Sequence, residues 1–210
     1  MIRRLTGLLL LVATLGVASN SYAHTTECDW VAGHTTEPER QAPGVPPGQI
    51  NYKGAAFACE RDLKADPDNI HLMYELGHLL WFQSPYQDKA RSLKLIKTAA
   101  DRGYAQAQFV MGLAYSGDMF GKLLPVDFCE SAKYHLKAAR WGRYASLISY
   151  SRFALKGKFD SCKEKVDWKE VAGFLDLARG AYQYDWYDGL LIDDLEELQA
   201  KTHPVVKNKQ

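Results

Sequence analysis

The amino-acid sequence predicts an all-α fold, an α-solenoid of about four helical hairpins preceded by an irregular N-terminal segment. Beyond position 52, apolar residues recur at helical spacing, and Gly, Pro or Asp residues break the pattern at short intervals. The segment Asp88 to Ala100 lines up 39 positions later with Asp127 to Ala139, and a weaker copy begins at Asp167. Repeats of this length are typical of stacked hairpins, each of which buries its apolar face only against its neighbours.

The first 23 residues have the pattern of a secretory signal peptide. Two arginines precede an apolar run from Leu5 to Val17, and Ser21-Tyr22-Ala23 closes the run with small residues at its outer positions. This run is shorter than the ~20 residues of a membrane-spanning helix, and no later stretch is apolar enough to span. We therefore expect a mature chain that begins near His24 and is periplasmic or secreted.

The charge balance argues against nucleic acid or an anionic membrane surface as the partner. Without the two arginines of the leader, the 26 basic residues fall to 24, against 25 acidic ones, which gives a net charge of −1. No large basic excess remains to attract polyanions. The 187 residues of the mature chain are enough for one compact domain or one short repeat array.

Residues 24–51 are rich in Pro, Gly and Thr, which predicts an irregular segment rather than a helix. A helical repeat domain is expected over 52–201, followed by a C-terminal tail at 202–210. Each expected helix is too short to be stable alone, so the helices must stack on one another. The expected helices lie at 52–65, 69–83, 87–101, 104–117, 127–140, 143–156, 167–180 and 185–200.

The run from Ala99 to Gly117 (AADRGYAQAQFVMGLAYSG) resembles the core of a Sel-one-like repeat. The stretch Gly54 to Leu80 is similar to an ordinary tetratricopeptide hairpin. The next copy departs from the pattern, because Tyr144-Ala145-Ser146-Leu147 replaces the Ala-Gln-Ala-Gln run and Ser151 stands where that family usually keeps Gly. The resemblance implies a non-catalytic adaptor or regulator of the bacterial cell envelope that binds another protein.

Small residues in the same run agree with closely packed helices. Gly103 can adopt the left-handed conformation that ends a helix. Ala105, Ala107 and Gly112 are small enough for paired helices to approach each other closely.

Four cysteines, all in the mature part, suggest two disulfides in an exported chain, and three pairings are possible. In a helical hairpin the start of the first helix lies beside the end of the second. Cys129 and Cys162 occupy those two places, so we expect them to pair. This leaves Cys28 to pair with Cys59 and to tether the N-terminal segment to the first helix; free buried thiols are the alternative.

Two groups of residues are candidates for contacts with a protein partner. In a stacked array, residues of the first helix of each hairpin line the inner surface. Lysines are frequent on these helices, at Lys94, Lys97, Lys133 and Lys137. Aromatic residues near the last hairpin are further candidates, because such side chains dominate interface hot spots, although filling the core where the last hairpin closes the array is the simpler interpretation. These residues are Tyr184, Trp186 and Tyr187.

A metal site is the main alternative from another class of function. His71, Glu75 and His78 fall on one face of one expected helix, although a solvated or groove-lining face is the simpler interpretation. An N-terminal His24 together with a second histidine such as His34 has the donors of a copper site. We expect neither metal nor other cofactor.

Catalysis has no support in the sequence, since GxSxG, HExxH and Gly-rich phosphate-binding motifs do not occur. We therefore expect no enzyme. An immunity or inhibitor protein that neutralises one exported enzyme is a further alternative.

Overall fold

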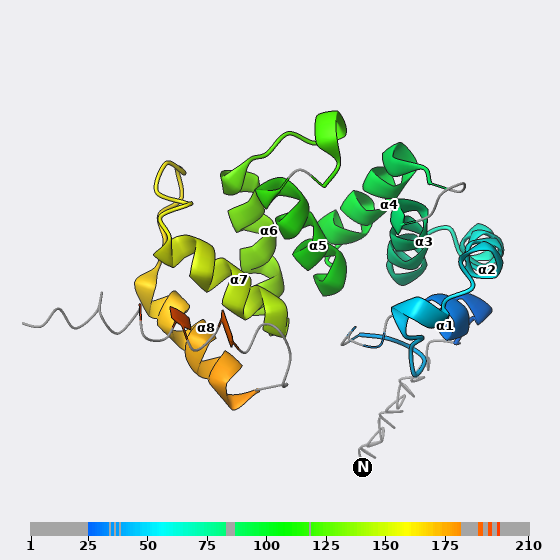
Figure 1. Ribbon diagram of the computed structural model, residues 1–210, viewed down its shortest axis with the longest axis horizontal. Coiled ribbons are helices and arrows are strands. Elements are labelled where there is room, and N and C mark those ends of the chain that lie inside the picture. Colours follow the sequence, from blue (N-terminus) through cyan, green and yellow to red (C-terminus); the bar gives the residue numbers. More distant parts are fainter. Residues whose placement is uncertain are drawn as a thin grey trace, which may run out of the picture.

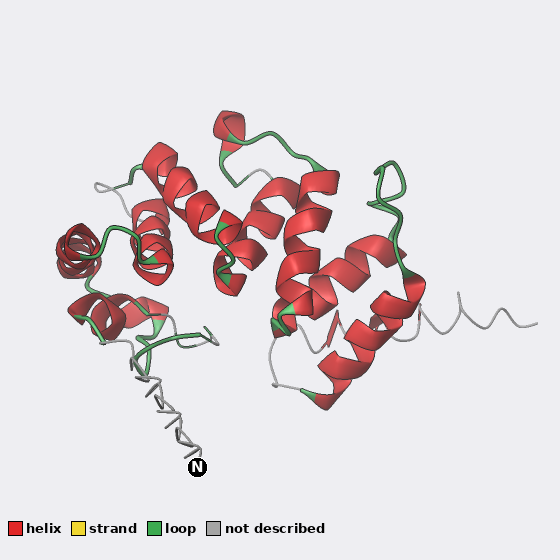
Figure 2. Cartoon of the chain, turned by 180° about the vertical axis from the view of Figure 1, so that it is seen from behind, coloured by secondary structure: helices red, strands yellow, loops and turns green. Residues whose placement is uncertain are grey.

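The chain folds into a row of short helices. The computed structural model describes residues 25–82 and 87–181, apart from 34, 36, 38 and 118, and then residues 189, 190, 193, 194 and 197. Within this part of the chain there are α-helices and 3₁₀ turns but no strand (Figure 2). The helices are α1 (Glu27–Ala32), α2 (Tyr52–Ala65), α3 (Ile70–Phe82), α4 (Lys89–Asp101), α5 (Ala105–Ser116), α6 (Phe128–Arg140), α7 (Tyr144–Leu155) and α8 (Trp168–Gly180), with turns η1 (Pro47–Gln49) and η2 (Gly121–Leu123).

Consecutive helices pack against each other in sequence from α1 to α8 (Figure 1). From α2 onward they form hairpins, α2 with α3, α4 with α5 and α6 with α7, and α8 begins the next unit. The second helix of each hairpin also packs on the first helix of the following one. This arrangement confirms the predicted α-solenoid.

Seven of the expected helices occur within two residues of their expected ends. The small differences arise because the expected ranges included residues that cap the helices rather than belong to them. The expected helix at 185–200 lies largely outside the described residues, and so do the leader at 1–23 and the tail at 202–210.

The same capping device begins each first helix. A side chain accepts hydrogen bonds from backbone N–H groups two or three residues further on, as where Asp127 Oδ1 accepts from Cys129 (2.8 Å) and Glu130 (3.0 Å). The caps of the four first helices are Asn51, Asp88, Asp127 and Asp167.

Two glycines end the first helices of the central hairpins. Gly103 and Gly142 follow α4 and α6 with φ angles of 103° and 82°, in the left-handed region that favours glycine. Each lets the chain turn at once into the second helix, as expected for Gly103.

A repeated polar contact joins each of the first two hairpins to the next one. The Ser92 hydroxyl of α4 donates to the backbone carbonyl of Gly77 in α3 (2.6 Å). One repeat later, the Ser131 hydroxyl of α6 donates to the carbonyl of Gly112 in α5 (2.8 Å). Because glycine has no side chain, the two helices lie close enough for a serine hydroxyl to reach the main chain between them.

The N-terminal segment contains one element that the sequence analysis missed, the short helix α1. Thr26 caps it and forms a capping box with Asp29, in which each residue accepts a hydrogen bond from the other's backbone N–H. The helix is only six residues long, so its apolar residues show no recognisable period. α1 packs on both α2 and α3.

Both expected disulfides are present. Cys28 of α1 is bonded to Cys59 of α2, and Cys129 at the start of α6 is bonded to Cys162 in the loop after α7. The second bond joins the two places that lie together in a helical hairpin. Two disulfides are compatible with an exported protein.

Buried apolar residues are distributed along the array rather than collected in one centre. Leu72, Leu76 and Leu79 of α3 belong to the N-terminal cluster, whereas Ile148 and Leu175 belong to the C-terminal one. Each hairpin thus completes its core with its neighbours. No helix in the described part of the chain is both long and apolar enough to cross a membrane.

Candidate functional site

The first helices of successive hairpins are linked side chain to side chain. We call the exposed surface formed by α2, α4, α6 and α8 the first-helix face. Three contacts connect adjacent first helices, two through a guanidinium group and one through a hydroxyl group. They are Arg91 to Glu60 (Nη2 to Oε2, 2.7 Å), Tyr134 to Asp101 (2.5 Å) and Arg140 to Glu170 (Nε to Oε1, 2.7 Å).

Two of the predicted lysines flank one aromatic ring on this face. The ammonium groups of Lys97 and Lys137 lie 6.0 Å and 5.6 Å from the ring centroid of Tyr134. Lys97 also pairs with Asp101 (2.6 Å), and this hydrogen bond raises the pKa of the Lys97 ammonium. Burial, together with its hydrogen bond to Asp101, raises the pKa of Tyr134 to about 12. The ring is therefore a neutral donor between two cations at physiological pH.

The other two predicted lysines lie apart from that ring. Lys94 is exposed on α4. Lys133 pairs with Glu130 on α6 and lines a groove between α6 and α8. The structure thus places all four lysines on first helices but brings only Lys97 and Lys137 to a common group.

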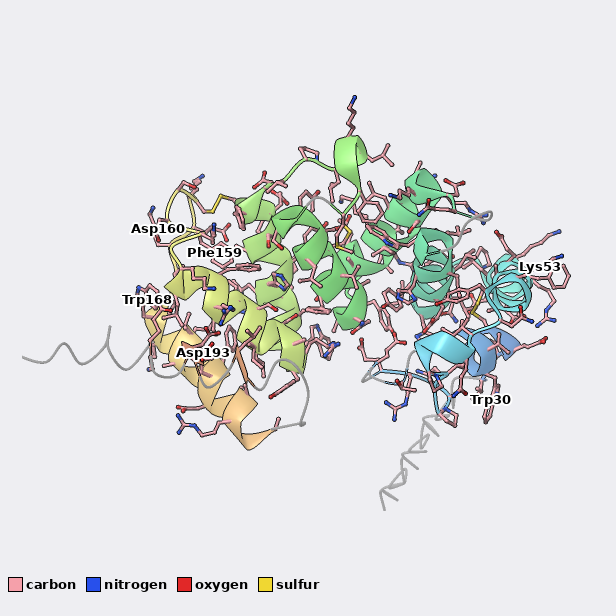
Figure 3. The ribbon with its side chains drawn as sticks, viewed as in Figure 1. Trp30, Lys53, Phe159, Asp160, Trp168 and Asp193 are labelled. Carbon is pink, nitrogen blue, oxygen red and sulfur yellow. A yellow bond between two sulfur atoms is a disulfide. The ribbon has the colours of Figure 1, made fainter. Side chains whose placement is uncertain are left out.

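The groove between α6 and α8 has a volume of about 340 Å³. The loop that follows α7 closes one side, and Figure 3 shows Phe159 of this loop turned toward the helices and Asp160 at its edge. Apolar side chains and the Cys129–Cys162 disulfide lie between basic and acidic side chains of α6, of α8 and of the loop that joins α7 to α8. The apolar lining includes Ala132, Leu136, Phe159 and Val166, and the charged lining includes Lys133, Arg140, Lys163, Glu164 and Glu170.

An exposed phenylalanine lies at the other end of the first-helix face. Phe57 of α2 is 73% exposed and borders a shallow depression with Leu63 and the Arg91–Glu60 pair. Single exposed apolar side chains are common on protein surfaces, so this ring alone does not mark a binding site. The aromatic candidates Tyr184, Trp186 and Tyr187 lie outside the described residues, as do His24 and His34.

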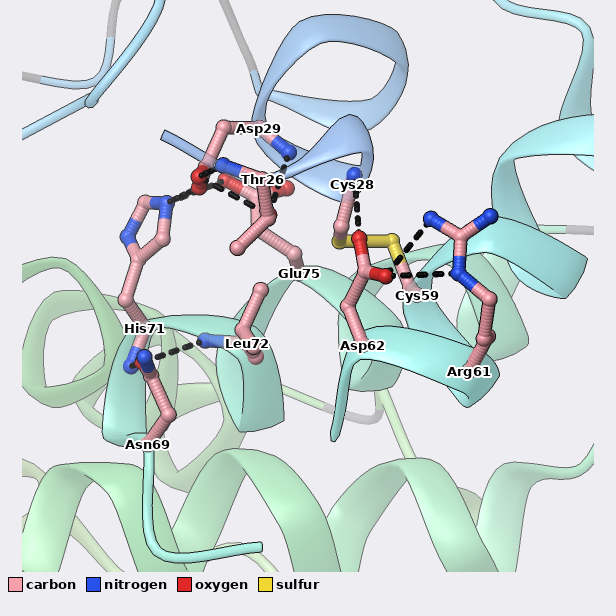
Figure 4. Close-up of a disulfide and its surroundings, with 10 residues drawn as sticks. All are labelled: Thr26, Cys28, Asp29, Cys59, Arg61, Asp62, Asn69, His71, Leu72 and Glu75. Atoms are coloured by element: carbon pink, nitrogen blue, oxygen red, sulfur yellow. Dashed lines mark hydrogen bonds and ion pairs between the residues drawn. A yellow bond between two sulfur atoms is a disulfide. The ribbon is translucent and has the colours of Figure 1, made fainter. Parts of the chain in front are cut away.

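The expectation of a solvated face at His71 and Glu75 is wrong. His71 is 8% exposed and Glu75 is completely buried. They are covered by the N-terminal segment, which brings Asp29 of α1 and Glu37 against α3 (Figure 4 shows Asp29 facing His71). The sequence pattern of α3 contained no sign of these partners, because they come from a segment without helical periodicity.

The side chains around His71 form a connected network. Its Nε2 atom lies 2.7 Å from Asp29 Oδ1 and 3.8 Å from Glu75 Oε1, and its Nδ1 atom lies 2.8 Å from the Tyr104 hydroxyl. Tyr104 donates its only hydroxyl proton to Glu37. Nδ1 must therefore donate its own N–H to the Tyr104 oxygen, which leaves Nε2 facing the carboxylates.

Burial and the neighbouring charges shift the pKa values of these carboxyl groups in opposite directions. Burial, with the nearby Glu37 carboxylate, raises the pKa of Glu75 well above its ordinary value. Burial opposes the ionisation of Asp29 as well, but hydrogen bonds from His71 and Thr26 outweigh it and lower the Asp29 pKa. The cluster thus holds an Asp29 that ionises readily next to a Glu75 whose carboxyl group keeps its proton to a higher pH than usual.

Of the three candidate metal ligands His71, Glu75 and His78, the structure brings only His71 and Glu75 together. One ligand atom each of Glu37, His71 and Glu75 lies within 4.8 Å of the other two. His78 is not part of this group and instead stacks on Tyr74, with ring centroids 5.8 Å apart. The third member, Glu37, lies 34 residues before His71, at a spacing that no metal-binding motif contains.

No protein-family model matches the chain, and no curated protein matches it. Among solved structures, the chain is similar to a protective antigen present in uropathogenic Escherichia coli strains, which displays an SLR fold. The two share 19% sequence identity with a TM-score of 0.48. The alignment covers 73% of this chain and 34% of the antigen, so this chain spans about a third of that protein's length.

Proposed function

We propose that the protein is an exported, non-catalytic repeat module that binds another protein in the cell envelope and acts there as an adaptor or regulator. The first-helix face is the proposed binding surface. The observation that carries this proposal is the groove between α6 and α8, where an apolar floor lies between charged side chains of two linked helices. Interfaces commonly combine an apolar centre with a polar rim in this way.

The groove suits a partner segment that presents one apolar side chain flanked by acidic residues. Leu136 and Phe159 offer the apolar floor. Lys133 at the rim and Lys137 beside Tyr134 provide positive charge on the exposed side of α6. Opposite charges on the partner would speed the encounter and fix its orientation on the face.

The experiment is a crosslinking pull-down from the cell envelope with the oxidised mature protein, followed by mass spectrometry. We expect a partner that the Lys133→Glu/Lys137→Glu variant no longer recovers, because both substitutions replace attraction with repulsion. Lys122→Glu is the control for reversing the charge of an exposed lysine outside the first helices, since Lys122 is exposed in η2. Each Lys→Glu substitution makes the same change of charge, so the double variant changes it twice as much as the control. Recovery of the same partner by all three proteins would contradict a binding site on α6.

A further inference from the structure

A group of buried side chains between the N-terminal segment and α3 plays no part in the proposed protein-binding surface. Glu37 and Glu75 are completely buried, and Asp29 and His71 nearly so. We propose that Glu37, His71 and Glu75, with Asp29 beside them, form a binding site for one divalent transition-metal ion, and for Zn²⁺ in particular.

Unsatisfied carboxylate oxygens are the first reason for this proposal. Among the described residues, no N–H group or hydroxyl donates to either Glu75 oxygen or to Glu37 Oε2. The side-chain hydrogen bond between Glu75 and Glu37 requires a proton on one of the two carboxyl groups, so these oxygens are left without a donor when both are ionised. A buried carboxylate without a hydrogen-bond donor or a cation is strongly unfavourable. The Glu75 side chain points into the same small volume as Glu37 and His71, so one ion there would satisfy several of these oxygens together.

The second reason for proposing a cation here is that carboxyl groups outnumber basic groups in the cluster. Three carboxyl groups surround one imidazole, and the ion pairs of Asp29 and Glu75 both go to His71. Even a protonated His71 supplies only one positive charge against three potential negative ones. A divalent cation corrects this imbalance without requiring that two carboxyl groups remain protonated.

The orientation of His71 matches that of a metal ligand. Its Nδ1–H donates to Tyr104, which in turn is held by Glu37. Metal-ligating histidines nearly always donate their second ring N–H in this manner, which fixes the tautomer and directs the other nitrogen at the ion. Here Nε2 is directed at Asp29 and Glu75, and a bound ion would take the place of the proton through which Nε2 hydrogen-bonds to Asp29.

The chemistry of the donors favours zinc over calcium or magnesium. One imidazole with carboxylates suits a first-row divalent ion, whereas Ca²⁺ and Mg²⁺ prefer oxygen ligands throughout. Zinc bonds to nitrogen and oxygen are about 2 Å long, so ligand atoms around zinc lie roughly 3–4 Å apart. The present spacing of up to 4.8 Å would have to contract by about 1 Å when the ion binds.

An access route for the ion lies next to the cluster. A pocket of about 440 Å³ opens beside His71 and Asp29 and is lined further by Asp62 and Asp66. Acidic walls raise the local concentration of cations. A bound ion would hold Glu37 on α3, close to the point where the Cys28–Cys59 disulfide already holds α1 on α2.

Zinc titration of the oxidised, chelator-treated mature protein tests this site. Isothermal titration calorimetry with ZnCl₂ alone is expected to show one ion bound per chain. Thermal unfolding in the presence of ZnCl₂ is expected to show a higher Tm, because the ion binds only the folded site. Glu75→Gln, which keeps the shape of the side chain but removes its charge, should weaken binding by at least about tenfold. Glu60→Gln, at an exposed glutamate on α2, should leave it unchanged.

Binding of Co²⁺ in place of Zn²⁺ gives a second test that uses the unchanged protein, so its result does not depend on whether a variant folds. Visible and X-ray absorption spectra of the Co²⁺ form are expected to show one imidazole nitrogen with carboxylate oxygens. Absence of stoichiometric zinc would overturn the proposal and mean that protons alone neutralise the cluster. Equal binding by Glu75→Gln, or a spectrum with several imidazoles, would overturn it too. None of these three results bears on partner binding by the first-helix face.

Discussion

The imidazole of His135 lies directly against Gly112, so that a Cβ atom added to Gly112 would be 2.7 Å from three atoms of the ring. His135 is completely buried in α6, and neither ring nitrogen has a hydrogen-bond partner among the described residues. It occupies the position that Ile96 holds one repeat earlier and Leu175 one repeat later. A histidine has thus replaced an aliphatic residue at the contact that sets the spacing of α5 and α6.

Gly112→Ala should destabilise the protein by about 1–3 kcal/mol, because the new methyl group overlaps the ring and α5 and α6 must move apart. The measurement is urea unfolding followed by circular dichroism. Gly173→Ala is the matched control in α8, where an added Cβ meets nothing within 4 Å. That change should stabilise the protein by up to about 1 kcal/mol through helix propensity. Equal effects at both positions would show that the contact with His135 does not constrain the interface.

Acid should weaken the fold through His135. Burial lowers its pKa to about 3, against 6.5 in the unfolded chain. Between pH 6.5 and 3 the unfolded state therefore binds one more proton than the folded state, and stability falls as the pH falls. Linkage gives a loss of about 2 kcal/mol from this residue between pH 7 and pH 5. Urea unfolding of the protein at the two pH values measures the total change.

His135→Leu isolates that contribution. Leucine restores the aliphatic residue of the neighbouring repeats and removes two unsatisfied ring nitrogens, so we expect a more stable protein at pH 7. Its stability loss between pH 7 and pH 5 should be smaller than that of the unchanged protein by about 2 kcal/mol. An identical pH dependence in both proteins would mean that His135 does not titrate on unfolding.

The serine hydroxyls between hairpins should contribute measurably to stability. Ser92→Ala and Ser131→Ala each remove a buried hydrogen bond to a glycine carbonyl and should cost about 1 kcal/mol. Thr98→Ala is the control, because the Thr98 hydroxyl bonds within its own helix at an exposed position. Thermal or urea unfolding compares the three variants. Losses no larger than that of Thr98→Ala would show that these contacts do not hold the hairpins together.

Removal of the Cys129–Cys162 disulfide should lower stability by up to about 4 kcal/mol in the chain-entropy model, since the bond closes a loop with a sequence separation of 33. The Cys129→Ser/Cys162→Ser variant measures this loss by urea unfolding. Because the bond also lines the groove between α6 and α8, the variant should bind the proposed partner more weakly under conditions where it remains folded. Undiminished binding would place the partner away from this groove.

The sequence predicts the repeat architecture well because its signals are local and recur. The caps Asp88 and Asp127 are 39 residues apart, and Gly103 and Gly142 recur at the same distance. The Cys129–Cys162 pair follows from the geometry of any helical hairpin, so it could be deduced before the structure was known.

The buried cluster shows what local patterns miss. Helical spacing places His71 and Glu75 on one face, but whether that face is solvated depends on what covers it. The covering residues Asp29 and Glu37 belong to a segment without periodicity, and Tyr104 lies one hairpin further along the chain. Only the tertiary structure brings these five side chains together.

The most direct measurement is site-specific photocrosslinking in the cell envelope, with the reactive residue placed at position 133 or 137 of α6, or at position 122 of η2 as the comparison. Binding through the first-helix face predicts that one and the same protein is crosslinked from positions 133 and 137 and is not crosslinked from position 122. A crosslinked protein recovered equally from all three positions, or from position 122 alone, would contradict it.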